Sequence, residues 1–207
     1  MIELARKFTE QELEMIRGKL LLEGSRLFSR FGLKKTSIEQ LTKAAGISPA
    51  AFYKFYASKE ELYFKIFEDK AYTNQALLIE EVMKENAGSP STAIRQMLTK
   101  GMEQIQEDPF LEHSEEDLNL VMRSVSKDEI AAHVFRDYMQ FSPVFEQLQA
   151  SGKVISEDPE VLTAIVQLYF TMNEHRSKFK PQIFDQAMAL LSDWIAKGFT
   201  QVQEAQV

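Results

Sequence analysis

The segment between residues 36 and 62 constrains the fold of this chain more tightly than any other part of the sequence. It reads TSIEQLTKAAGISPAAFYKFYASKEEL and alternates helix-forming runs with residues that start or stop helices. Ser37, with Gln40 three residues later, predicts a capping box at the start of a helix over residues 38–45. Gly46 suits the left-handed conformation that often ends such a helix.

Two further helix starts follow. Ser48 can cap a short second helix, and Pro49 suits its first position, where no amide donor is needed. Ser58, followed by Glu61, has the pattern of another capping box and predicts a third helix. A helix, a turn of about four residues and a short second helix have the spacing of a helix-turn-helix, whose second helix enters the major groove of DNA.

The side chains of the short second helix separate into two faces. Phe52 and Tyr56 are four residues apart, so we expect them on one buried side. They would cover Leu41, Ala45 and Ile47. The opposite side carries Ala50, Tyr53 and Lys54, and we expect it to face DNA. There Lys54 can reach a guanine edge or a phosphate, and the Tyr53 hydroxyl can bond a phosphate.

These residues resemble the DNA-binding domain of the TetR (tetracycline repressor) family of bacterial transcriptional regulators. The matching positions are Phe31-Gly32, Thr36-Ser37, Ala44-Ala45-Gly46, Ser48, Phe52-Tyr53 and Ser58-Lys59-Glu60-Glu61-Leu62. Beyond residue 70 the chain matches the family only in length and helical character. The resemblance implies an all-α fold of about nine helices. It has a three-helix DNA-binding domain at residues 9–70 and a helical effector-binding and dimerisation domain at residues 71–207.

The resemblance also implies which residues contact operator DNA. The corresponding positions here are Thr36, Ser37, Ser48, Pro49, Ala50, Tyr53, Lys54 and Lys59. Thr36-Ser37 and Lys59 stand at predicted helix starts, where amide groups and the helix dipole favour a phosphate. Phe55 and Tyr56 reverse the tyrosine-phenylalanine order that is common in the family, so either ring can be the buried one.

The distribution of charge agrees with a nucleic-acid-binding segment near the N-terminus. The whole chain has a net charge of -7, but residues 17–59 contain nine basic and two acidic residues. Residues 71–207 contain 11 basic and 21 acidic residues. A basic segment that coincides with the helix-turn-helix predicts a DNA-binding module joined to a domain with another role.

The remaining chain is predicted to be helical throughout. A first helix is expected from about Thr9 to Phe31, and Gly88-Ser89-Pro90 should end the helix that starts at Lys59. Ser114 and Ser126 are predicted to cap two further helices. The second of these contains Pro143, which predicts a kink or a break near Phe141. The last two helices are expected to start near Pro159 and after Pro181.

The two C-terminal helices have more apolar positions than one buried stripe requires. Between residues 160 and 174 the polar residues form one narrow stripe: Glu160, Thr163, Gln167, Thr171 and Glu174. A surface helix needs one apolar stripe, so these helices have area left for a second copy. In the TetR family they form a four-helix dimer interface. This implies interface positions at Leu162, Ile165, Tyr169, Met188, Leu191, Trp194 and Ile195. The alternative is a helix buried deeply within a monomer.

The resemblance further implies a small-molecule effector bound in a cavity of the C-terminal domain. Residues 91–179 hold aromatic and methionine side chains that suit an apolar pocket. The candidates are Met97, Met102, Phe135, Tyr138, Tyr169 and Met172. Such residues at helical spacing are more often part of an ordinary core, and the sequence does not identify the effector.

The sequence favours a regulator over an enzyme. It contains no cysteine, which excludes disulfides and thiolate chemistry. His113, His133 and His175 have no second histidine three or four residues away, so we expect neither a metal nor a cofactor. Motifs such as G-x-S-x-G or a phosphate-binding glycine loop are absent. The sequence shows no signal peptide and no long apolar run, so we expect a cytoplasmic protein.

We therefore expect a homodimer that binds palindromic double-stranded operator DNA and represses transcription until a small molecule releases it. Paired DNA-binding domains would read two half-sites one helical turn apart. Activation is also open, because the direction of control depends on where the operator lies. The alternative is a helical ligand-binding or adaptor protein with a vestigial DNA-binding domain. It predicts that Tyr53→Ala and Lys54→Ala leave activity intact.

Overall fold

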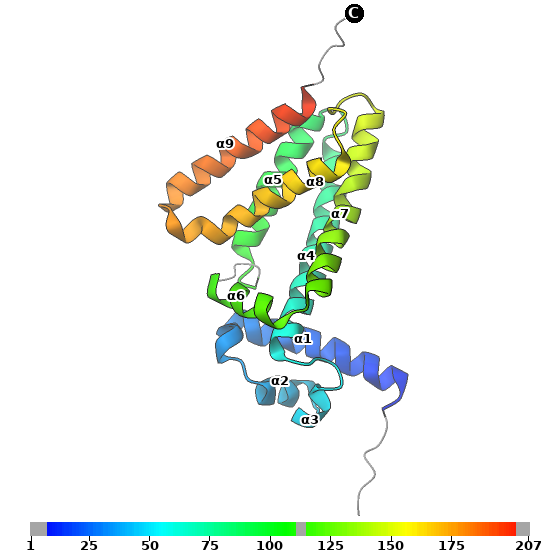
Figure 1. Ribbon diagram of the computed structural model, residues 1–207, viewed down its shortest axis with the longest axis vertical. Helices are drawn as coiled ribbons and strands as arrows, with labels where there is room; N and C mark the ends of the chain where they lie inside the picture. Colours follow the sequence, from blue (N-terminus) through cyan, green and yellow to red (C-terminus); the bar gives the residue numbers. More distant parts are fainter. Residues whose placement is uncertain (1–7, 111–114, 202–207) are drawn as a thin grey trace, which may run out of the picture. The chain divides into compact units, whose positions relative to one another are not determined.

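The computed structural model of this protein describes residues 8–110 and 115–201 and is all-α (Figure 1). These residues form nine α-helices, in agreement with the prediction of about nine. They also form one 3-10 helix. They divide into two compact units. The first contains the described residues up to Asp69 together with Glu115–Ser126, and the second contains the others from Lys70 onward.

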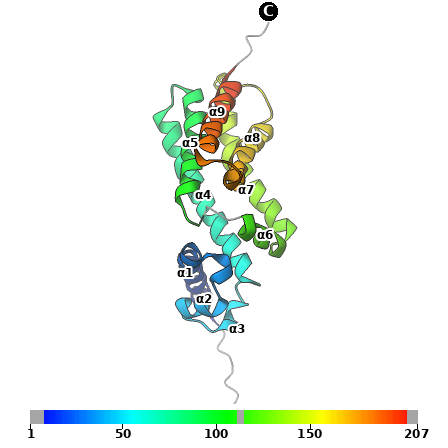
Figure 2. The same ribbon diagram turned by 90° about the vertical axis from the view of Figure 1, so that its left-hand side faces the viewer.

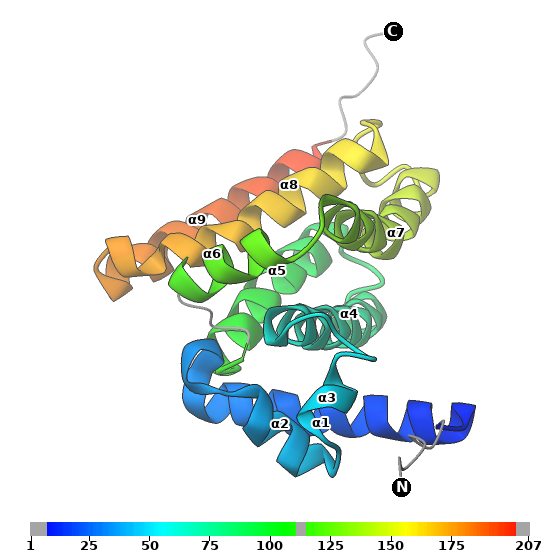
Figure 3. The same ribbon diagram turned by 60° about the horizontal axis from the view of Figure 1, so that its bottom comes forward.

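The first unit contains the predicted helix-turn-helix (Figure 3). Its elements are α1 (Glu10–Lys35), α2 (Ile38–Ala45), α3 (Pro49–Phe52), the start of α4 (Lys59–Glu85) and α6 (Glu115–Ser124). The ends of α2 are confirmed: Ser37 and Gln40 form a capping box, and Gly46 has a φ of 74°. The α1 helix continues past its predicted end, but Gly32 interrupts its regular conformation with a φ of 75°.

The core of the first unit joins α1, α2, α3 and α4. Its fully buried side chains include Leu20, Leu33, Leu41, Phe52 and Leu62. Of the two rings that the sequence left open, Tyr56 is buried and Phe55 is only half-buried. Burial raises the pKa of Tyr56 to about 12, so this phenol stays neutral at physiological pH.

The second unit is a bundle formed by the remainder of α4 and the later helices. These are α5 (Pro90–Glu107), α7 (Lys127–Ala150), α8 (Pro159–Thr171), the 3-10 helix η1 (Met172–Lys178) and α9 (Pro181–Thr200). The α5 helix packs beside α9, and α7 packs beside α8 (Figures 1 and 2). Phe145 is fully buried, and its ring meets that of Phe199 edge to face at 5.6 Å between centroids.

Pro143 does not break α7, so of the predicted kink or break near Phe141 the break is absent. A proline inside a helix removes a backbone hydrogen bond and costs about 3 kcal/mol. The neighbouring Phe141 and Phe145 are both buried in the core, and burial of two phenylalanine side chains contributes about as much stabilisation or more. Packing therefore keeps the helix continuous, while the proline itself lies on the exposed side.

The α6 helix contacts α1, which places it in the first unit. The sequence prediction counted its residues with the C-terminal domain, and the division into residues 9–70 and 71–207 stays a prediction. The expected cap at Ser114 lies outside the described residues.

A substitution on α1 tests the packing of the first unit. A methyl group added at Gly24 would come within 2.8 Å of the buried Ile66 Cδ1 and 3.2 Å of Leu62 Cδ2. We expect Gly24→Ala to lower the free energy of unfolding by about 1–3 kcal/mol through overpacking, measured by urea denaturation.

Gly18→Ala is the matched control, because Gly18 lies on the same helix and has nothing within 4 Å of the added methyl. It should raise stability by about 1 kcal/mol through helix propensity. Equal effects of the two substitutions would contradict the close approach of α1 and α4.

Candidate nucleic-acid interface

The α3 helix has only four residues and depends on its surroundings for its structure. At its start, the Ser48 hydroxyl accepts a hydrogen bond from the Ala51 amide at 3.2 Å, and Pro49 occupies the first turn. At its end, Phe52 is completely buried, and its ring lies 6.1 Å from that of Tyr56. These contacts fix the direction in which the opposite face of α3 points.

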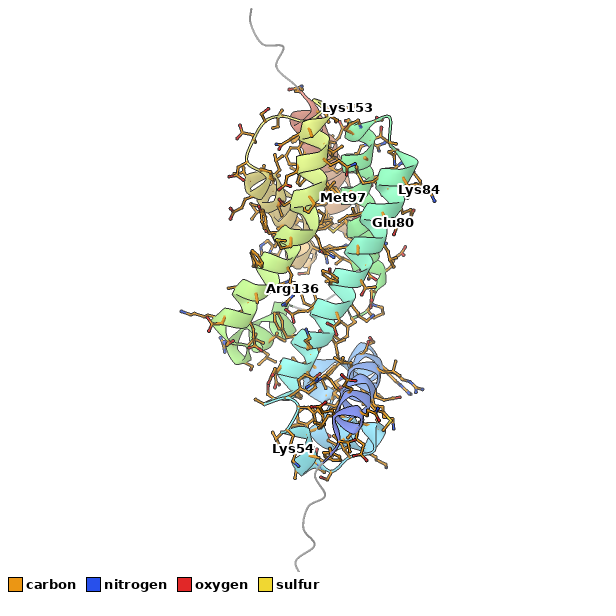
Figure 4. All side chains as sticks on the ribbon, turned by 90° about the vertical axis from the view of Figure 1, so that its right-hand side faces the viewer. Lys54, Glu80, Lys84, Met97, Arg136 and Lys153 are labelled. Atoms are coloured by element: carbon orange, nitrogen blue, oxygen red, sulfur yellow. The ribbon has the colours of Figure 1, made fainter. Side chains whose placement is uncertain are left out.

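That opposite face carries the predicted DNA-contacting side chains. Tyr53 is 60% exposed, although its ring rests edge-on against Phe52. Lys54 is exposed, with its ammonium 5.3 Å from the centre of the Phe8 ring (Figure 4). An exposed cation–π contact contributes about 0.5–1 kcal/mol, so Lys54 can exchange it for a phosphate or a base edge. Ala50 and Pro49 are exposed on the same helix.

A concave surface of about 460 Å³ lies beside this face. It collects residues from the end of α1, the starts of α2 and α4, and α3. They are Lys34, Lys35, Thr36, Ser37, Ile38, Glu39, Pro49, Tyr53, Ala57, Ser58, Lys59 and Glu60. Two helix N-termini therefore border one concavity that also carries lysines, an arrangement suited to phosphate oxygens.

Thr36 is part of this region through its position, while its hydroxyl is turned inward. The residue is buried, and its hydroxyl donates to the Gly32 carbonyl at 2.8 Å. This bond fixes the turn between α1 and α2. The Thr36 hydroxyl therefore already donates to a carbonyl within the protein.

Lys59 is also held by the protein itself. Its Nζ lies 2.6 Å from the Leu33 carbonyl, 2.8 Å from the Thr36 carbonyl and 3.4 Å from the Lys34 carbonyl. An ammonium has three donors, and these bonds use all of them. A positive charge is favourable at the C-terminal end of α1. Lys59 thus joins the start of α4 to the turn before α2 and builds one wall of the concavity.

Other charged residues of the concavity have no predicted role in DNA contact. Lys34 and Lys35 belong to the last turn of α1, directly before Thr36, and that position was the available signal. Glu39 brings a negative charge to the same surface. Its own backbone amide, and then the Ser37 hydroxyl, hold the pKa of its carboxyl below the usual value. A phosphate at the start of α2 would compete with this carboxylate.

The expected capping box at α4 forms in a shifted version. The Ser58 hydroxyl accepts from the Glu61 amide at 3.1 Å, as predicted. The Glu61 carboxylate accepts from the amide of Ala57, one residue before the expected position. The result still satisfies backbone donors at the start of α4.

Comparison with known proteins agrees with this geometry. Residues 20–66 match the sequence model of the family described as "Bacterial regulatory proteins, tetR family". The chain is 33% identical over 100 residues to the HTH-type transcriptional regulator AcrR of Shigella flexneri. The chain belongs to the TetR family. The match spans 48% of this chain and 46% of AcrR, so it covers about half of that relative.

Solved TetR-family structures share the fold along nearly the whole chain. A regulator from Pectobacterium atrosepticum has a TM-score of 0.75 at 17% identity, covering 94% of this chain and 98% of that one. FadR from Thermus thermophilus, a TetR-family repressor solved in complex with lauroyl-CoA, has a TM-score of 0.68 at 18% identity. That match covers 92% of this chain and 98% of FadR. At these identities the likeness establishes the TetR-family fold.

The predicted dimer positions on α8 and α9 lie at different depths. Leu162, Tyr169 and Met188 are buried in the core of the second unit. Ile165, Leu191 and Ile195 are half-buried, and Trp194 is exposed. The role of these positions in dimerisation stays a prediction.

The predicted effector-pocket residues are similarly divided. Met97 (Figure 4), Met102 and Tyr169 are buried in the core, and Tyr138 is half-buried. Phe135 and Met172 are exposed.

Metal-binding groups and membrane-spanning helices are both absent from the part of the chain that the structure describes. No group of three or more histidine, aspartate or glutamate side chains there is placed to hold a metal ion, and His113 lies outside these residues. No helix in the described ranges has both the length and the apolar character needed to cross a membrane.

The bonds of Lys59 predict a stability effect that a DNA-contacting lysine would not have. Lys59→Met keeps much of the aliphatic stem but removes all three donors. We expect a loss of about 1–3 kcal/mol in the free energy of unfolding, measured by chemical denaturation.

Lys54→Met should lower the free energy of unfolding by no more than about 1 kcal/mol, because it removes only the exposed cation–π contact with Phe8. If Lys59→Met were as stable as the parent protein, the three carbonyl contacts would not hold the α1–α2 turn.

Proposed function

We propose that this TetR-family protein is a sequence-specific transcriptional repressor that binds palindromic operator DNA as a homodimer and is released by a small-molecule effector. It would act in the cytoplasm. The observation that carries the proposal is the exposed face of α3 with Tyr53 and Lys54, fixed by buried Phe52 beside a lysine-bearing concavity. This is the geometry of a helix placed in a major groove with phosphates held at its side.

The contacts of this interface divide into two kinds. Lys54 and Tyr53 would reach base edges or nearby phosphates from α3, with the small side chain of Ala50 allowing close approach. The amides at Ser37 and Ser48, together with Lys34 and Lys35, would hold the DNA backbone and set the register. Thr36 and Lys59 would support these contacts through the backbone they position.

The exposed apolar residues of α8 and α9 support dimerisation. They are Val161, Leu168, Ile183, Leu190 and Trp194. Large apolar side chains left exposed on α8 and α9 favour an interface, and a second copy of the same two helices would complete a four-helix arrangement. A dimer would present two α3 helices to two half-sites.

Ligand binding by the second unit is supported by its relatives. FadR of Thermus thermophilus was solved with lauroyl-CoA. RolR, whose structure is similar to this chain with a TM-score of 0.63 at 18% identity, was solved with resorcinol. For release, the effector must bind more tightly to a conformation that binds DNA poorly, and the coupling is reciprocal. The same protein would act as an activator if its operator lay where it helps the polymerase.

The first test is selection of binding sites from a random DNA pool with the folded dimer at two salt concentrations. We expect a palindromic motif whose affinity falls as salt rises. Lys54→Met should weaken binding and, if Lys54 contacts a phosphate, reduce the salt slope by about one. Recovery of no motif would favour the adaptor alternative. Full DNA binding by the Tyr53→Ala and Lys54→Ala proteins would contradict the proposed role of the α3 face.

The dimer face is tested by Trp194→Glu. Trp194 is 61% exposed, so the charge should leave the monomer folded while it weakens dimerisation at least about tenfold, measured by analytical ultracentrifugation. Leu22→Glu is the control, because Leu22 is 69% exposed on α1. An unchanged dimer after Trp194→Glu would move the interface away from this face.

A further inference from the structure

The polar stripe of α8 faces the interior of the second unit along part of its length. Thr163 is only 1% exposed. One turn later, Gln167 Nε2 lies 3.5 Å from the Val134 carbonyl of α7. Leu168 is 61% exposed and Val161 is also exposed. The α8 helix therefore buries one polar side chain and exposes two apolar ones, while other apolar residues, such as Val166, are buried as in an ordinary surface helix.

Three buried oxygen atoms in this region lack a hydrogen-bond partner among the described residues. They are Thr163 Oγ1 on α8, Gln140 Oε1 on α7 and Gln75 Oε1 on α4. Most buried polar groups in proteins are hydrogen-bonded, and leaving one without a partner costs free energy. Three such atoms on three helices call for a common explanation.

The orientation of Gln140 is set by a hydrogen bond. Its Nε2 donates to the Tyr72 carbonyl of α4 at 2.9 Å. The amide nitrogen must face that carbonyl, because two oxygens would repel each other. The remaining atom, Oε1, is therefore an acceptor.

Two contacts relate the three oxygen atoms to α7. Tyr72 lies one turn before Gln75, so Gln140 reaches the part of α4 that carries Gln75. Thr163 lies one turn before Gln167, which contacts α7, so Thr163 is on the α7-facing side of α8. The acceptors thus belong to the region where α4 and α8 each meet α7.

Other buried hydroxyls of the second unit are satisfied. Tyr169 Oη lies 3.3 Å from the Met188 carbonyl, and Ser192 Oγ lies 2.8 Å from the Ala189 carbonyl. Ser142 Oγ lies 3.0 Å from Glu146 Oε1. These three buried hydroxyls are therefore paired, unlike that of Thr163, while Asn173 Oδ1 of the 3-10 helix is also without a partner among the described residues.

We propose that Gln75, Gln140 and Thr163 accept hydrogen bonds from the effector, which is an uncharged or singly protonated molecule with an apolar body and at least two N–H or O–H donors. This inference rests on the proposed ligand-controlled function. Amide oxygens attract donors and repel carboxylates or phosphates. Arg136, one turn before Gln140, already has an interaction partner. The apolar part of the ligand would lie near Phe170, which packs against Gly101.

The first experiment compares two threonine-to-valine substitutions in the full-length protein without effector. Thr163→Val removes an unpartnered hydroxyl and should raise the Tm. Thr42→Val is the matched control: Thr42 is equally buried, but its hydroxyl lies 2.8 Å from the Ile38 carbonyl, and its loss should not raise the Tm. A lower Tm for Thr163→Val would show that the hydroxyl is satisfied in solution and would overturn the proposal.

The second experiment tests the ligand class with three probes: 4-hydroxybenzyl alcohol, its dimethyl ether and benzoate. Ligand-detected NMR should show binding of the alcohol and little or none of the other two. Thr163→Val and Gln75→Leu should each weaken that binding about five- to tenfold. Equal binding of the ether or benzoate, or binding of none of the probes, would contradict the proposed donor recognition.

DNA binding separates this inference from the function on which it rests. The Thr163→Val protein should select the same DNA motif as the parent. If the parent selects a motif but the probes show no donor preference, only the ligand inference fails. If the parent selects no motif, the proposed repressor function fails whatever the probes show.

Discussion

The burial of Phe52 is the interaction on which the proposed DNA-binding surface depends. A helix of four residues has no stability of its own, so its direction comes from the side chain that anchors it. Truncating a buried phenylalanine to alanine typically costs about 3–5 kcal/mol, more than the caps of α3 contribute. Lys59 has a comparable role on the other side of the concavity, where it holds the turn before α2. Residues that need not touch DNA thus determine where Tyr53 and Lys54 point.

The local part of this unit could be predicted from the sequence because its signals act over a few residues. Ser37 with Gln40, Gly46, and Ser48 with Pro49 each determine the backbone within about one turn, and each appears in the structure as predicted. The inward roles of Thr36 and Lys59 could not be predicted in this way. Lys59 bonds carbonyls that lie 23 to 26 residues earlier in the chain, and no local pattern encodes such a pairing.

The second unit shows a different limit. Its helix starts follow from proline and cap residues, but the faces of α8 did not follow from its polarity. A periodic pattern is read on the assumption that polar residues face water, whereas Thr163 is buried and Leu168 is exposed. A protein that binds a second copy on one side of a helix and a polar ligand on the other would expose apolar side chains and bury polar ones at those positions. The proposed dimer face and the proposed ligand site would therefore both account for the depths of Leu168 and Thr163.

The most direct test of the account is dimethyl sulfate protection of guanine N7 on the selected DNA site. N7 lies in the major groove, where α3 is proposed to bind. The account predicts protection in two half-sites about one helical turn apart, lost with Lys54→Met if Lys54 reads a guanine. Bound protein that leaves every major-groove guanine of the site reactive would contradict the placement of α3.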